Sequence, residues 1–119
     1  MLNLKQGDPL LHLLIKSEGT LCVITKLKVK ILPLPPHKET FTAGFVNLQD
    51  TMQAVQKIIS LGFIPSALEV MDSNALALTH YKDTDIKALL ICELEGDKKQ
   101  VNKQSKQIIN IFKNSGAKK

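Results

Sequence analysis

The chain has 119 residues, 44% of them hydrophobic and 23% charged, which is ordinary for a folded protein and argues against a disordered chain. All 16 basic residues are lysine, so the arginine contacts typical of nucleic-acid binders are absent, and we read the net charge of +5 as a solubility feature without a nucleic-acid partner. No apolar run approaches the ~18 residues of a membrane span and no signal-peptide pattern is present, so we expect a cytoplasmic protein.

The first predicted element is a short helix over residues 8–15, with Asp8 as its cap and Pro9 in its first turn. A polar break with Gly19 follows. Apolar side chains and lysines then alternate over residues 22–32, which predicts a strand with one buried face and one solvated face. The prolines of residues 33–36 end this strand and predict a stiff boundary between two modules.

Beyond this boundary the pattern predicts strands and helices in turn. The strands are expected over residues 40–46, 64–71 and 87–95, and the helices from Asn47 to Gly62, from Asp72 to about Leu78, and over 98–114. The apolar stripes of the two longer helices are expected to face the core, and they consist of Leu48, Met52, Val55 and Ile59 in the first and Val101, Ile108, Ile109 and Phe112 in the second. Whether the strands run parallel or antiparallel stays open.

Few residues point to chemistry by their spacing alone. Cys22 and Cys92 are far apart and the histidines are isolated, so we expect free buried thiols and no metal site. The carboxylate pairs Glu69 with Asp72 and Glu93 with Glu95 are expected on the surface. No catalytic residue is predicted. The one unusual feature is the loop of residues 17–20, because such loops present backbone N–H groups to a ligand.

Read with its flanks, this loop resembles a known family. The segment Gly7–Thr25, G-D-P-L-L-H-L-L-I-K-S-E-G-T-L-C-V-I-T, is similar to the end of the flavin-binding domain in FAD-linked oxidases of the vanillyl-alcohol-oxidase type. These include the glycolate oxidase FAD subunit and the D-lactate and D-2-hydroxyglutarate dehydrogenases. A second motif, I-P-S-A-L-E-V-M-D at Ile64–Asp72, is typical of the next domain of these enzymes.

The resemblance implies an α+β fold in two parts. Residues 1–36 would be the C-terminal edge of a PCMH-type FAD-binding domain, and residues 37–119 the first part of the cap domain, a partial ferredoxin-like sheet with helices on one face. It also implies FAD as cofactor and a small 2-hydroxy acid as substrate of the parent enzyme. The matching flavin-side residues are Ser17, Glu18, Gly19, Thr20, Val23 and Ile24.

Three departures from the family pattern lie in the flavin part. Lys16 and Cys22 stand where the family has glycine, and Asp8-Pro9 stands where it has Tyr-Asp. The glycine-rich pyrophosphate loop and the H-x-G-D-G-N-x-H motif of the family do not occur in these residues. We therefore expect a fragment that is inactive alone and pairs with complementary enzyme fragments or with itself.

Two other readings remain open. Residues 36–119 have an intact amphipathic pattern and would also suit a free-standing ferredoxin-like module that binds a protein or a small ligand. A nucleic-acid-binding domain would have only the positive charge in its favour.

Overall fold

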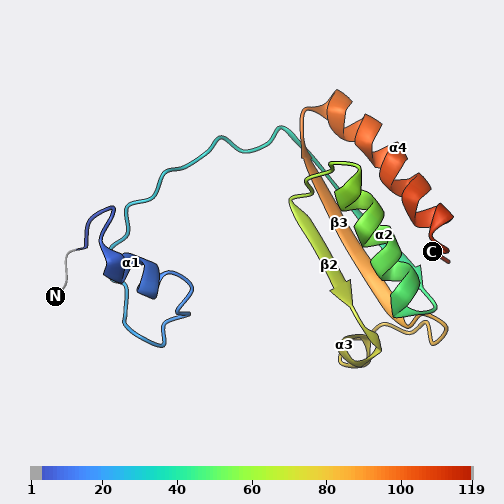
Figure 1. Cartoon of the computed structure of the whole chain (residues 1–119), viewed down its shortest axis with the longest axis horizontal. Helices are drawn as coiled ribbons and strands as arrows, with labels where there is room; N and C mark the ends of the chain where they lie inside the picture. Colours follow the sequence, from blue (N-terminus) through green and yellow to red (C-terminus); the bar gives the residue numbers. More distant parts are fainter. Residues whose placement is uncertain (1–3, 119) are drawn as a thin grey trace. The chain divides into compact units, whose positions relative to one another are not determined.

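The computed structural model describes residues 4–118 and divides into two compact units, Met1–Pro33 and Leu34–Lys119 (Figure 1). In the described part of the first unit, the only regular element is helix α1, Pro9–Leu14. The carboxylate of Asp8 accepts a hydrogen bond of 3.0 Å from the N–H of Leu10, and Pro9 fills the first helical position, as predicted. No described side chain of this unit is fully buried.

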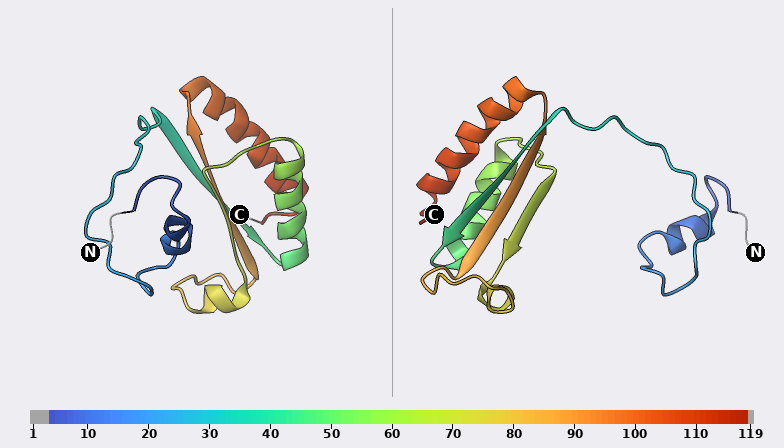
Figure 2. Two further views of the ribbon diagram at one scale, coloured as in Figure 1. Left: turned by 60° about the vertical axis from the view of Figure 1, so that its left-hand side comes forward. Right: turned by 180° about the vertical axis from the view of Figure 1, so that it is seen from behind.

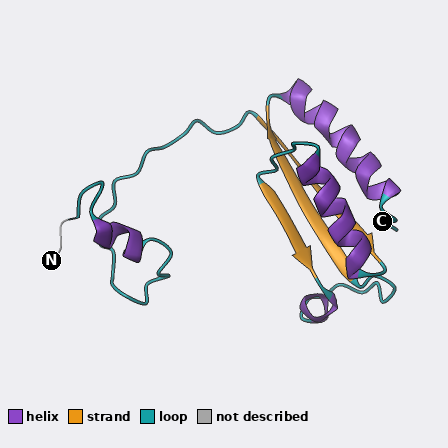
Figure 3. Cartoon of the chain, in the orientation of Figure 1, coloured by secondary structure: helices purple, strands orange, loops and turns teal. Residues whose placement is uncertain are grey.

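The predicted strand over residues 22–32 is wrong for this structure. These residues form an extended loop (Figure 3), and the apolar side chains are exposed, with Val23 at 86% and Ile31 at 83%. A strand is held by hydrogen bonds to a neighbour, and among residues 4–118 no strand pairs with this segment. The alternating pattern of residues 22–32 is therefore typical of a strand, but within residues 4–118 no other strand pairs with it.

The second unit is built on a three-stranded sheet. Its elements in chain order are β1 (His37–Phe45), α2 (Leu48–Ser60), β2 (Ala67–Met71), α3 (Ser73–Ala77), β3 (Ala88–Gly96) and α4 (Lys98–Asn114). The strand order is β1-β3-β2, and β3 is antiparallel to both neighbours, which settles the question that the sequence left open. Helices α2 and α4 cover the same face (Figure 2), so the predicted α+β sheet with helices on one face is confirmed.

Local capping explains most helix boundaries in this unit. The side chain of Asn47 accepts from the N–H of Asp50 at 2.8 Å and donates to its carboxylate, which forms the predicted cap of α2. Asp72 and Asp97 cap α3 and α4 in the same way. Strand β2 begins at Ala67 rather than at residue 64, because Pro65 has no N–H to offer the ladder.

The core lies between the sheet and the two long helices. Its fully buried members include Phe45 of β1, Leu90 and Cys92 of β3, and Val101 and Ile108 of α4. The predicted stripe of α4 is largely confirmed, since only Ile109 is partly open, with 38% exposed.

The stripe predicted for α2 is correct only at Val55, which is partly buried and packs against the core. Leu48, Met52 and Ile59 are 47%, 44% and 60% exposed, so Met52 is not a core residue. The helix instead buries its Thr51, Ala54 and Ile58 side. The predicted stripe and the Thr51, Ala54 and Ile58 side both have helical spacing. The side with Ala54 is the one buried against β3 and α4, because this small residue allows the helix to approach them closely.

None of the helices in the described part of the chain is long and apolar enough to cross a membrane.

Candidate functional site

The predicted flavin-side residues Ser17–Thr20 form one tight turn. The N–H of Thr20 donates to the carbonyl of Ser17 at 2.9 Å, and the Thr20 hydroxyl donates to the same oxygen at 2.7 Å. The two central residues, Glu18 and Gly19, have positive φ angles of 49° and 79°. Their N–H groups have no acceptor among residues 4–118, so the turn presents two free donors.

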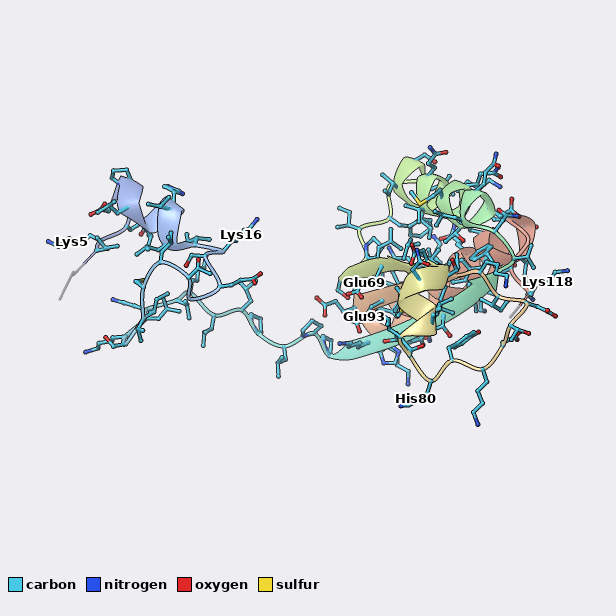
Figure 4. The ribbon with its side chains drawn as sticks, turned by 90° about the horizontal axis from the view of Figure 1, so that it is seen from below. Lys5, Lys16, Glu69, His80, Glu93 and Lys118 are labelled. Carbon is cyan, nitrogen blue, oxygen red and sulfur yellow. The ribbon has the colours of Figure 1, made fainter. Side chains whose placement is uncertain are left out.

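Lys16, just before this turn, also has a positive φ, of 67°. A side chain in the left-handed region costs about 1–2 kcal/mol relative to glycine. The family pattern has glycine at this position, so the structure gives a physical reason for that glycine. Lys16 and Glu18 are the two non-glycine residues with positive φ in the described chain, and both flank Ser17. Figure 4 shows Lys16 extending from the turn.

Val23 and Ile24 lie after the turn in the extended loop. Both are open to solvent, at 86% and 58% exposed. The structure therefore brings Ser17, Glu18, Gly19 and Thr20 together, and it leaves the two apolar residues that follow them largely exposed.

A polar network lies on the open face of the sheet, and no pattern in the sequence predicts it. Its centre is Glu93 of β3, whose carboxylate lies 2.9 Å from Nζ of Lys38 and accepts hydrogen bonds of 3.1 Å from the hydroxyls of Thr40 and Ser66. The backbone carbonyl of Glu93 also accepts from the N–H of Ser66 at 2.8 Å. Glu93 thus ties β1 and the start of β2 to the central strand. Figure 4 labels Glu93 and its neighbour on this face, Glu69.

The network shifts two pKa values in opposite directions. The hydrogen bond from Lys38, with those from Ser66 and Thr40, lowers the pKa of Glu93 below its usual 4.5. The bond to Glu93 raises the pKa of Lys38 above its usual 10.5. Because the folded-state pKa of Glu93 is lowered, its contribution to stability is present above pH 4.5 and is lost as the pH falls through the folded-state value.

We expect Glu93→Gln to reduce the acid sensitivity of the fold. The wild-type urea midpoint should fall as the pH drops below 4.5, and the variant should show a shallower fall because its amide does not titrate. Glu69→Gln is the matched control, since Glu69 lies on the same face and makes no hydrogen bond or ion pair with a described residue. Equal acid slopes for wild type and Glu93→Gln would contradict this role.

A second cluster joins β1 to α4 on the helix-covered face. The hydroxyl of the buried Ser105 donates to the carboxylate of Glu39, whose other oxygen lies 3.1 Å from Nε2 of His37. The bonds from Ser105 and then His37 lower the pKa of Glu39. The carboxylate stands between the serine and the histidine, so the order required for a nucleophilic triad is not met. The cluster is a structural link between β1 and α4.

The remaining candidate residues do not gather into a site. Asp72 is used as a cap, and Asp83 accepts from the N–H of Asp85 at 3.2 Å within a loop. Within residues 4–118, no three His, Cys, Asp or Glu side chains come close enough to hold a metal ion. Cys92 is buried in the core, whereas Cys22 is only partly covered, so the expected pair of buried thiols is correct for one of the two.

The chain is similar to flavoenzymes over most of its length. It is 36% identical to glycolate oxidase subunit GlcD of Escherichia coli (strain K12) over 118 residues, which cover 93% of this chain and 23% of that protein. It is 34% identical to GlcD of Bacillus subtilis (strain 168) over 116 residues, 93% of this chain and 25% of the relative. A D-lactate dehydrogenase of Anaerostipes hadrus is 30% identical over 105 residues, 79% of this chain and 22% of the relative. The chain therefore spans about a quarter of the length of these relatives.

A solved structure shares the fold. An alkyldihydroxyacetonephosphate synthase superposes with a TM-score of 0.69 at 23% identity, over 98% of this chain and 26% of that one. The C-terminal domain of FAD linked oxidases matches residues 34–119, the stretch that forms the second unit. On these findings, the chain belongs to the FAD-linked oxidase family, and its residues 34–119 match the C-terminal domain of that family.

Proposed function

We propose that this chain forms part of an FAD-dependent oxidoreductase that acts on a small 2-hydroxy acid such as glycolate or D-lactate. The match of residues 34–119 to the C-terminal domain of FAD linked oxidases, together with the likeness to GlcD across 93% of the chain, carries this proposal. Residues 1–36 would supply the edge of the flavin domain and residues 37–119 the first part of the cap domain.

Within this enzyme, we assign Ser17, Glu18, Gly19, Thr20, Val23 and Ile24 to the flavin side. Two observations support the assignment. The turn offers the free N–H groups of Glu18 and Gly19, which suit the oxygen and nitrogen atoms at the edge of an isoalloxazine ring. Val23 and Ile24 expose apolar surface directly after it. FAD would supply the redox chemistry, while these residues orient one edge of its ring and exclude water from it.

The described residues hold only part of what FAD requires. The flavin-side residues all lie in one turn and the loop after it, and no phosphate-binding loop of the G-x-G-x-x-G type occurs in the sequence. We therefore propose that the chain alone neither binds FAD tightly nor oxidises hydroxy acids, and that complementary fragments of the enzyme are its functional partners.

The test is a direct one on the purified chain. We expect no retained yellow flavin after FAD is added and removed by gel filtration, and no dye reduction with glycolate or D-lactate above a protein-free blank. Clear substrate-dependent dye reduction by the chain alone would overturn the proposed inactivity and leave the family assignment standing.

A chimaera tests whether the segment is competent in a complete enzyme. The matching stretch of Escherichia coli GlcD is replaced by this chain, and bound flavin and glycolate turnover are measured. Since Lys16 carries a strained positive φ where the family has glycine, Lys16→Gly should raise the fraction of chimaera that retains flavin. Lys28→Gly is the matched control, because Lys28 lies in the extended loop outside the turn. Equal flavin contents in both variants would argue against the assigned position of the turn.

One observation favours a second candidate, a free-standing interaction module. The second unit has a continuous hydrophobic core of its own, formed by residues of β1, α2, β3 and α4. Reading frames beside this one distinguish the two. If they encode the missing flavin and histidine motifs and co-expression restores flavin binding, the split enzyme is supported.

A further inference from the structure

We draw no further inference here: the strongest candidate, the edge of the sheet at β1 with the apolar groove that Phe41, Ile109 and Phe112 line beside it, carries none because nothing in the described part of the chain shows what covers it.

Discussion

Phe45→Ala is expected to lower the free energy of unfolding of the second unit by about 3–5 kcal/mol. Phe45 is fully buried at the end of β1, and it belongs to the cluster that joins the sheet to α2 and α4. Removing the ring takes away its transfer free energy and leaves a cavity that the packed neighbours fill only in part. A small domain has a total stability of roughly 5–15 kcal/mol, so this loss is a large share of it.

Urea denaturation followed by far-ultraviolet circular dichroism measures this loss, since the chain has no tryptophan. Phe41→Ala is the matched control because it removes the same ring from the same strand. Phe41 is only partly buried and lines the groove at the edge of β1, so its loss should cost about 1–2 kcal/mol. If the two variants lost the same stability, the placement of Phe45 at the centre of the core would be wrong.

The second large effect concerns the thiols. Cys92 is fully buried in β3, and this burial raises the pKa of its thiol from the usual 9.0 to about 11. Near neutral pH, the thiolate fraction of Cys92 is therefore about a hundredfold lower than that of an unperturbed thiol. Because the side chain is fully buried, a thiol reagent in solution also cannot reach it. We expect a thiol reagent in dilute solution to modify Cys22 in the folded chain and Cys92 only after denaturation.

Cys22→Ser is the control, because the folded variant should show no reactive thiol and the denatured variant one. Rapid modification of both thiols in the folded chain would contradict the burial of Cys92.

The raised pKa of the Cys92 thiol also makes the stability of the fold depend on pH. The buried neutral thiol contributes fully below pH 9.0, and the contribution falls as the pH rises toward about 11. The urea midpoint should therefore decrease over this range in the wild type and less in Cys92→Ala.

The candidate flavin turn was predictable because its geometry is local. The turn of Ser17–Thr20 is closed by hydrogen bonds between residues three apart, and its glycine marks the positive φ. The family motif then names its role. The strain at Lys16 was foreseen as a departure from glycine, and the structure supplies the angle that explains it.

The network at Glu93 was not predictable in the same way. Its hydroxyl partners Thr40 and Ser66 lie 53 and 27 residues away in the sequence. They meet only because β3 is the central strand, between β1 and the chain that enters β2. Spacing along the chain predicts only that Glu93 and Glu95 are both surface carboxylates. The strand order places Glu93 next to its hydrogen-bond partners on two other segments.

The sequence by itself determined where the helices begin and end and which family the chain resembles. Caps such as Asn47, Asp72 and Asp97 act on N–H groups within three residues, so these signals need no knowledge of the rest of the molecule. The tertiary structure decided which side of α2 is buried and that residues 22–32 form no strand. Both depend on surfaces brought from elsewhere in the chain, since an apolar stripe or an alternating segment is buried only where a partner surface exists to receive it.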